Sequence, residues 1–362
     1  MLQRLDFADN IRTVLICQVI MVHAAVTYGG EGGWYFREPT DSLATVVSLT
    51  LFNALSQSFF MSLLFLLAGF FTQHSLQRTA VARYWLTRLK RLGLPLLAYY
   101  LGVGPLTAWL ALQLEGGGDF HYLRSLHAGP MWFAQALLIF TGLFLLIRPL
   151  FKPSHNLQRI PFSWYSIMLF ALVLWLVSIP ARACWPMGEG IAGMQLGSFG
   201  HYSLMYLVGI LAARSRWSDW LQNVPMKPLY LLVSLGCAVL PVGMMLGVDP
   251  ESGFEPFMGG LSWQALFYEG WESMMCVLLS VLVLNRFLQT QRMQQPVWRQ
   301  MGRANYGVYF LHPPLLLFAS MLLIGIDLPP IIKFFAASAI TIGMSFPLAW
   351  GLTRLPVIRD IF

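Results

Sequence analysis

Long apolar segments recur along the whole sequence, each about as long as a helix that crosses a lipid bilayer. Such a helix needs about 20 mostly apolar residues. We expect ten of them, close to residues 11–28, 49–73, 92–114, 129–147, 164–180, 202–213, 229–247, 264–285, 305–324 and 331–353, the sixth being the shortest. The pattern predicts an all-α integral membrane protein with about ten transmembrane helices.

The composition excludes a water-soluble globular protein. Of the residues, 57% are hydrophobic and 11% are charged, whereas a soluble domain carries about 25% charged residues. The net charge of +7 would suggest a nucleic-acid partner in a soluble protein, but here the basic residues gather in particular loops. We therefore expect the protein to lie in a lipid bilayer and to bind no nucleic acid. The loops are too short for a further domain, so residues 1–362 are predicted to form a single membrane domain.

The distribution of Lys and Arg predicts the orientation. If the N-terminus is inside and the ten helices alternate, 19 of the 23 basic residues fall in inside segments. Three basic residues, Arg37, Arg124 and Arg182, fall in outside loops, and Lys333 lies at a helix end. Because basic residues favour the cytoplasmic side of membrane proteins, both termini are expected in the cytoplasm.

Cysteine and histidine spacing gives no sign of a disulfide framework or a metal site. The four cysteines, at positions 17, 184, 237 and 276, form no CxxC pair, and no two histidines are separated by four residues. We therefore propose no metal.

Arg12 and His23 are the first polar pair inside an apolar segment. Eleven residues correspond to about 20° of net helix rotation and about 17 Å along the axis, so both lie on one helix face. Histidine is the usual general base near neutral pH, and polar residues in a membrane segment suggest function. Alternatively, Arg12 is a basic anchor at the inner surface, and His23 forms a hydrogen bond between helices.

Arg88 and Arg91 lie at the cytoplasmic entry to the third segment. Being three residues apart, they share a helix face, where two guanidinium groups can bind the phosphates of coenzyme A. An ordinary anchor that binds anionic lipid remains the alternative.

Glu269 and Glu272 lie in the outer half of the eighth segment, at a depth similar to that of His23. A carboxylate there can orient an imidazole and stabilise its charged form. Helix packing or an acidic outer rim is the alternative for both residues.

Three further residues, two aromatic and one histidine, are candidates for binding substrate. Tyr309 and His312 precede two prolines that free backbone carbonyls in the ninth segment, and His312 either lines a cavity or hydrogen-bonds to a neighbouring helix. Trp132, at the outer end of the fourth segment, either stacks on a sugar or belongs to the interfacial belt of aromatic residues.

Five short motifs, in order and over nearly the full chain, resemble the membrane acyltransferase family 3. They are Asp9-Asn-Ile-Arg12 followed by His23, Phe65-Leu-Leu-Ala-Gly69-Phe70, Arg88-x-x-Arg91-Leu-x-x-Pro95, Trp132-Phe133 and Tyr306-Gly-Val-Tyr-Phe-Leu-His312-Pro. The chain departs from the family at Ala68, where Ser is usual, and it lacks the common Gly after Arg12. The segment Trp271-Glu272-Ser273 looks closest to the branch of glucan succinyltransferase-like proteins.

The resemblance implies a bacterial inner-membrane O-acyltransferase, with acyl-CoA as the donor substrate and an extracytoplasmic or membrane-bound glycan, or another alcohol, as the acceptor. His23 would then be the base, Arg88 and Arg91 would hold coenzyme A, and Arg12 would line the donor passage. Glu272 would orient His23 or bind acceptor hydroxyls. We place Trp132, Glu269, Tyr309 and His312 with the acceptor. A proton-coupled transporter and a non-catalytic scaffold remain alternatives. Whether the protein forms a homodimer is left open.

Overall fold

The computed structural model describes residues 6–150, 163–215, 217–249, 251–290 and 296–355, and within these ranges the chain contains helices and no β-strand. The prediction of an all-α membrane protein is confirmed. Several basic residues used to orient the helices lie outside the described ranges, namely those at 4, 152, 159, 216, 292 and 359. The cytoplasmic location of both termini stays a prediction.

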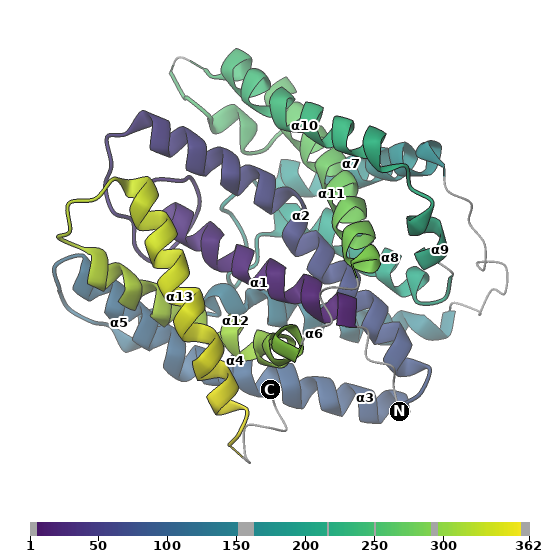
Figure 1. Ribbon diagram of the computed structural model, residues 1–362, viewed down its shortest axis with the longest axis horizontal. Helices are drawn as coiled ribbons and strands as arrows, with labels where there is room; N and C mark the ends of the chain where they lie inside the picture. The colour runs from purple at the N-terminus through teal and green to yellow at the C-terminus, as the bar shows by residue number, and fades with distance from the viewer. Residues whose placement is uncertain (1–5, 151–162, 216, 250, 291–295, 356–362) are drawn as a thin grey trace. The chain divides into compact units, whose positions relative to one another are not determined.

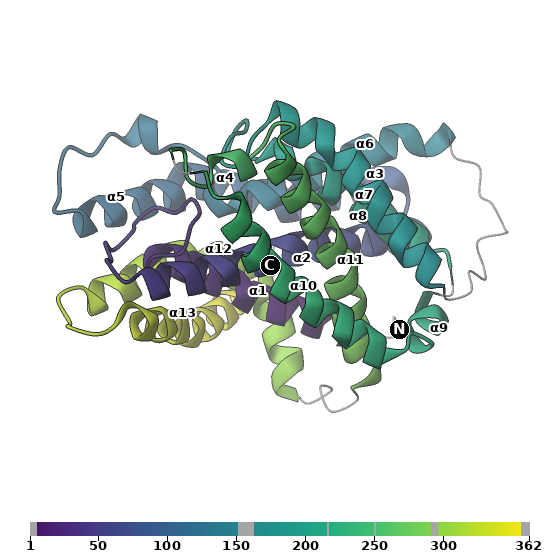
Figure 2. The same ribbon diagram turned by 90° about the horizontal axis from the view of Figure 1, so that it is seen from above.

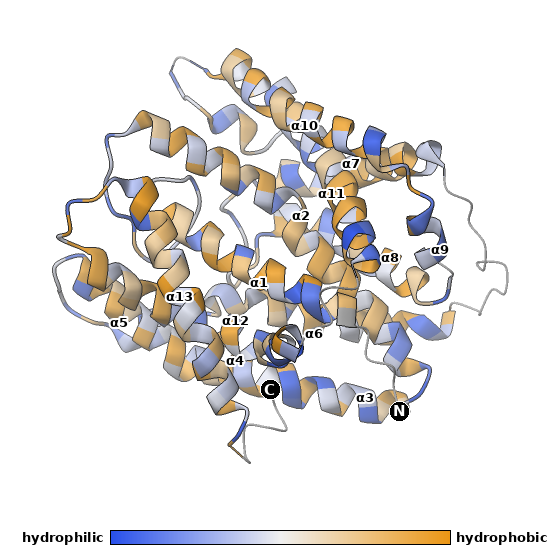
Figure 3. Cartoon of the chain, in the orientation of Figure 1, coloured by the Kyte–Doolittle hydropathy of each residue, from blue (hydrophilic) through white to orange (hydrophobic). Residues whose placement is uncertain are grey.

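Nine helical segments in the described part of the chain are long and apolar enough to cross a membrane. They are α1 (Asp6–Thr27), α2 (Leu43–Leu76), the run Val81–Leu114, the run Gly129–Leu150, α7 (Trp164–Cys184), α10 (Met226–Gly247), α11 (Trp263–Gln289), α12 (Pro296–Leu323) and α13 (Pro330–Leu352). They correspond to nine of the ten predicted segments, with the largest shifts at the third segment, which begins at Val81 instead of 92, and at α12, which begins at Pro296 instead of 305. Figure 3 shows that these long helices are mainly apolar.

The predicted sixth segment corresponds to α8 (Phe199–Ala212), which has 14 residues. At 1.5 Å per residue, this helix is about 21 Å long, which is shorter than the ~30 Å hydrocarbon core of a bilayer. By length and composition, α8 is therefore not one of the candidate spans, and its crossing of the membrane stays a prediction.

Two helical runs depart from regular α-helix. The run Val81–Leu114 consists of α3 (Val81–Arg88), η1 (Leu89–Gly93), α4 (Leu94–Ala98), η2 (Tyr99–Val103) and α5 (Gly104–Leu114), where η1 and η2 are π-helical turns. The run Gly129–Leu150 consists of η4 (Gly129–Met131), α6 (Trp132–Ile147) and η5 (Arg148–Leu150). π-Helical turns often mark functional sites, because they change which side chains share a helix face.

The chain divides into two compact units built from interleaved segments. The first contains residues 1–56, 85–138 and 292–362, and the second contains residues 57–84 and 139–291. The prediction of a single domain over 1–362 is not tested by this division.

In the first unit, α12 packs against α13, α1 and α5, and α1 also packs against α13, as Figure 1 and Figure 2 show. One of its apolar clusters contains Tyr28, directly after α1, with Leu316 from α12 and Phe334 from α13. These buried contacts place the last turn of α1 beside the last turns of α12.

In the second unit, α11 packs against α7, α10 and α9 (Trp217–Gln222), and α7 packs against α8. Helix α11 begins after Ser262, whose side-chain oxygen accepts a hydrogen bond from the backbone N–H of Ala265, as an N-cap residue does. Large apolar side chains such as Leu146, Met245 and Leu246 are exposed on the surface of this unit. In a membrane protein, such side chains face lipid.

Candidate functional site

His23 lies near the end of α1, and two nearly parallel rings contact it. The centroid of the Trp34 ring is 3.9 Å from that of His23, with 19° between the ring planes. The centroid of His312 is 5.5 Å away, at 11°. The His23 side chain is half-buried, but its Nδ1 is buried and has no hydrogen-bond partner in the described part of the chain. The exposed part of the His23 side chain, which a substrate can contact, therefore does not include Nδ1.

His312 is completely buried in α12, and the proline that follows it determines its protonation pattern. Pro313 has no N–H, so the carbonyl of Tyr309 lacks the donor that a regular helix would supply. His312 fills this position, because its Nδ1 lies 2.7 Å from the Tyr309 oxygen and must donate to it. In the neutral ring, Nε2 is then an acceptor, and it has no hydrogen-bond partner among the described residues.

A layer of aromatic side chains continues from Trp34 away from His23. The ring of Tyr35 packs edge-on against Trp34, and its hydroxyl lies 3.1 Å from the hydroxyl of Tyr99. Gly129, at φ 47°, lies against this pair, and an added Cβ would approach the Tyr35 hydroxyl to 2.3 Å. Only glycine therefore fits at this point, where φ is positive and the two hydroxyls come close.

The loop before Gly129 supplies a further histidine to this layer. The ring of His127 lies 5.4 Å from that of Tyr35, and its Nδ1 accepts a hydrogen bond from the backbone N–H of Gly129. Partial burial lowers the pKa of His127, so the ring is neutral at pH 7. Burial likewise raises the pKa of Tyr35. The layer around Trp34 thus carries hydroxyl and imidazole groups but no charge at neutral pH.

Tyr309 and Trp132, both predicted to bind acceptor, differ in their contacts. Tyr309 is buried, its hydroxyl donates a hydrogen bond to the carbonyl of Pro130, and its ring lies 5.8 Å from that of His312. Trp132 is half-buried at the start of α6 and packs edge-on against Phe133. Tyr309 therefore belongs to the surroundings of His312, while acceptor binding by either residue stays a prediction.

Arg12 lies at the opposite end of α1 from His23, in a cluster of polar groups. Its Nη1 is 3.4 Å from Oδ1 of Asp9, and its guanidinium lies within electrostatic range of Arg88. The side chain of Asn305 donates to the Asp9 carbonyl and accepts from the Thr13 hydroxyl, which ties α12 to α1 here. Two positive groups thus converge at the start of α1, about 17 Å along the helix axis from His23.

Arg88 and Arg91 differ in exposure. Arg88 ends α3 and is half-buried, whereas Arg91 lies in the π-helical turn η1 and is exposed. A π-helical turn rotates successive residues by less than an α-helix does, so residues three apart no longer share one face closely. Arg88 lies within electrostatic range of Arg12, and Arg91 adds positive charge at the surface.

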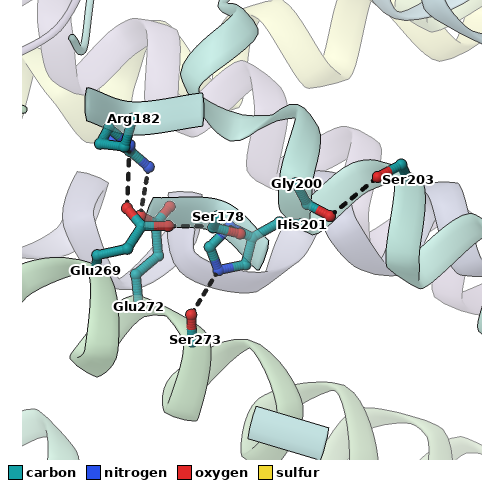
Figure 4. A network of polar contacts seen from close by, with 8 residues as sticks. All are labelled: Ser178, Arg182, Gly200, His201, Ser203, Glu269, Glu272 and Ser273. Atoms are coloured by element: carbon teal, nitrogen blue, oxygen red, sulfur yellow. Dashed lines mark hydrogen bonds and ion pairs between the residues drawn. The ribbon is translucent and has the colours of Figure 1, made fainter. Parts of the chain in front are cut away.

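The second unit contains a buried network of charged and polar side chains, drawn in Figure 4. Arg182 of α7 lies between two carboxylates of α11. Its Nε is 3.0 Å from Oε2 of Glu269, and its Nη2 donates to Oε2 of Glu272 at 2.7 Å. Side-chain exposure is 5% for Arg182, 2% for Glu269 and 9% for Glu272. The network thus joins α7 to α11 inside the unit.

His201 of α8 extends this network. Its Nε2 lies 3.0 Å from the Ser273 hydroxyl, and its Nδ1 lies 3.1 Å from the Ser178 hydroxyl and 3.5 Å from Oε1 of Glu269. The order serine, histidine, glutamate matches that of a catalytic triad. However, Ser273 is completely buried, and Nδ1 is closer to Ser178 than to the carboxylate. We interpret the network as a structural connection between α7, α8 and α11.

The structure corrects the placement of Arg182 and adds to the roles predicted for the two glutamates. The prediction that Arg182 lies in an outside loop is wrong, because α7 continues past Pro180 to Cys184 and Arg182 is buried there. The carboxylates of Glu269 and Glu272 neutralise its charge, which allows this position inside the unit. The described ion pair of Glu272 is with Arg182, so its partnership with His23 stays a prediction, as does acceptor binding by Glu269.

Trp34 is a residue of the site that sequence reasoning did not assign. In the sequence, Trp34 is an aromatic residue after a glycine-rich stretch, with no pattern that relates it to His23. No group of three or more potential metal ligands occurs in the described ranges.

Comparison with known proteins identifies the family of the chain. The model of a protein family described as an acyltransferase domain matches residues 5–350. Over 95 residues, the chain is 34% identical to glucans biosynthesis protein C of Escherichia coli strain SMS-3-5 / SECEC and 33% identical to the protein of that name from strain K12. The match covers 26% of this chain and 23% of each relative, so it spans less than a quarter of their length.

Proposed function

Because the chain belongs to the acyltransferase family whose model matches residues 5–350, we propose that it transfers an acyl group from cytoplasmic acyl-CoA to a hydroxyl of an extracytoplasmic or membrane-bound glycan, or another alcohol, in a bacterial inner membrane. One observation carries the proposal. Near one end, helix α1 has a half-buried imidazole, which is stacked on Trp34 and lies close to the ring of His312, and near the other end it has Arg12, which lies within electrostatic range of Arg88. Acyl-CoA has its thioester at one end and its phosphates at the other, so its reaction needs the base and the phosphate-binding guanidinium groups at separate places.

The donor binds through its phosphates. Arg12, near the start of α1, lies within electrostatic range of Arg88 at the end of α3, and Arg91 adds a third positive charge at the surface. Guanidinium groups bind phosphate oxygens through paired N–H donors, and coenzyme A has a diphosphate and a 3′-phosphate. The pantetheine arm then extends along α1 and brings the thioester carbonyl toward His23.

His23 acts as the general base. Its imidazole takes the proton of the acceptor hydroxyl while the hydroxyl oxygen forms a bond to the thioester carbon. The tetrahedral intermediate collapses, the C–S bond breaks, and the coenzyme A thiolate leaves. The imidazolium returns the proton to the thiolate, so that ester and free thiol form with no net release of a proton.

The acceptor approaches from the aromatic side of His23. Half-buried aromatic residues such as Trp34, Tyr35 and Trp132 supply flat apolar faces and hydroxyl groups, which suit a sugar. Tyr309 and His312 complete the surroundings of the base. The relatives' name suggests a glucan as the first acceptor to test.

The experiment measures release of free coenzyme A thiol by the purified protein in detergent, with acyl-CoA and a glucan acceptor. We expect acceptor-dependent release that is lost, by roughly a hundredfold or more, in His23→Ala, because a positioned base contributes about 10²–10⁴ to the rate. His121→Ala is the matched control, since His121 is exposed in a loop. Undiminished release by His23→Ala would remove the proposed base, and acceptor-independent uptake of a solute into proteoliposomes would favour the transporter alternative.

A further inference from the structure

The loop between α1 and α2 carries Trp34 and returns to α1 on both sides of it. The backbone N–H of Gly30 donates to the Ala25 carbonyl, and the backbone N–H of Glu38 donates to the Thr27 carbonyl, both at 2.7 Å. The side chain of Asn53 donates to the Glu31 carbonyl at 3.0 Å. The loop is therefore attached to α1 and α2, and Glu38 is the last of these attachment points.

At Glu38, the loop is also connected to α13. Nζ of Lys333 donates to Oε1 of Glu38 at 2.5 Å, and the exposed fractions of the two side chains are 6% and 24%. Lys333 lies in the first turn of α13, where the helix dipole disfavours a positive charge. A buried lysine at this unfavourable end is explained by its carboxylate partner.

We propose that Lys333 and Glu38 are positioning residues, which clamp the loop so that the Trp34 ring stays on the face of His23. The inference rests on the proposed role of His23 as the base. Three connected contacts support it. Lys333 binds Glu38, Glu38 follows Trp34 by four positions in the loop, and the centroid of the Trp34 ring lies 3.9 Å from that of His23.

The clamp affects the rate of the chemical step and not the binding of the donor. Trp34 covers one face of the imidazole and limits the rotation of its ring. A small misplacement of a catalytic group lowers the rate by up to about a hundredfold. The guanidinium groups proposed to bind coenzyme A lie at the other end of α1, so the KM for acyl-CoA depends on contacts that the clamp does not touch.

The test compares four variants of the full-length protein in detergent. Lys333→Met removes the charge and keeps the length of the side chain, and Lys333→Arg restores the charge. The double variant Lys333→Glu with Glu38→Lys reverses the pair. Lys227→Met is the matched control, because Lys227 is exposed on α10 in the second unit. The measurements are kcat, the KM for acyl-CoA, and modification of His23 by diethyl pyrocarbonate, followed by mass spectrometry of the peptide that contains it.

We expect Lys333→Met to lower kcat by roughly tenfold or more with little change in KM, and to increase the modification rate of His23 severalfold. Lys333→Arg and the reversed pair should restore both quantities, and Lys227→Met should match the wild type. Wild-type kcat and wild-type modification in Lys333→Met would overturn the proposal, as would an equal loss in all three clamp variants.

The modification measurement needs no turnover and therefore separates the two proposals. If the wild-type protein released no thiol from acyl-CoA but Lys333→Met still exposed His23, the clamp would stand and the proposed function would fail. If the wild-type protein was active and His23 was equally protected in every variant, the clamp alone would fail.

Discussion

Replacing Arg182 by methionine tests the buried network of the second unit. The change removes one positive charge and leaves the carboxylates of Glu269 and Glu272 together, with side-chain exposures of 2% and 9%. Methionine fills a similar volume, so the loss of charge dominates the result. The two carboxylates must then stay charged without a cation, take up a proton, or draw water into the unit, and each of these costs free energy.

The two N–O distances give the size of the effect. At 3.0 and 2.7 Å, each ion pair attracts with about 5–6 kcal/mol at an effective dielectric constant of ~20, before the cost of desolvation is subtracted. Removing one partner of a buried ion pair lowers the free energy of unfolding by about 3–5 kcal/mol. At roughly 2 °C per kcal/mol for a chain of this size, we expect Arg182→Met to lower Tm by about 6–10 °C.

The assay is thermal unfolding in detergent, followed by tryptophan fluorescence at a fixed scan rate, because unfolding of membrane proteins is often irreversible. Arg286→Met is the matched control. Arg286 is also in the last turn of a long helix, but it is exposed and lies 5.5 Å from the ring of Tyr230. Its replacement should change Tm by less than about 2 °C, since exposed contacts of this kind contribute about 0.5–1 kcal/mol.

A triple variant, with Arg182→Met, Glu269→Gln and Glu272→Gln, completes the test. It removes all three charges together, so no unpaired charge remains. We therefore expect its Tm to be higher than that of Arg182→Met by at least half of the decrease that Arg182→Met causes. A Tm of Arg182→Met equal to that of the wild type would refute the reasoning, and so would a triple variant that is less stable than the single one.

Two further predictions concern donor binding and helix packing. Combined replacement of Arg88 and Arg91 by alanine should raise the KM for acyl-CoA by roughly tenfold or more with kcat nearly unchanged, because charge-assisted hydrogen bonds contribute about 1.5–3 kcal/mol each. Gly69→Ala should lower the free energy of unfolding by about 1–3 kcal/mol, because the added Cβ would lie 2.0 Å from the Tyr206 carbonyl oxygen, measured by thermal unfolding.

Each of these predictions has its own control. For donor binding, Arg124→Ala changes an exposed arginine of the first unit, and it should leave the KM unchanged. An unchanged KM in the double variant would indicate that Arg88 and Arg91 are only topological anchors. For packing, Gly93→Ala introduces the same atoms where no neighbour lies within 4 Å, and equal Tm values for Gly69→Ala and Gly93→Ala would contradict the close approach of α2 and α8.

The sequence alone determined the helical segments and the residues that belong to the family pattern. Transfer of apolar residues into lipid depends on local length and composition, so windows of about 20 residues were enough to predict the nine long helices found among the described residues. The position of His23 on the same helix as Arg12 follows from helix geometry in the same way. Even the bond between His312 and the Tyr309 carbonyl reflects a local rule, since the proline after His312 leaves that carbonyl free.

The tertiary structure decided which side chains contact one another. Trp34 is stacked on His23, Lys333 pairs with Glu38, and Arg182 lies between two carboxylates of another helix. These partners are far apart in the chain or separated by an irregular loop, and no periodicity relates them. Their contacts depend on how helices pack and how much charge a buried position tolerates, and both are properties of the folded chain as a whole.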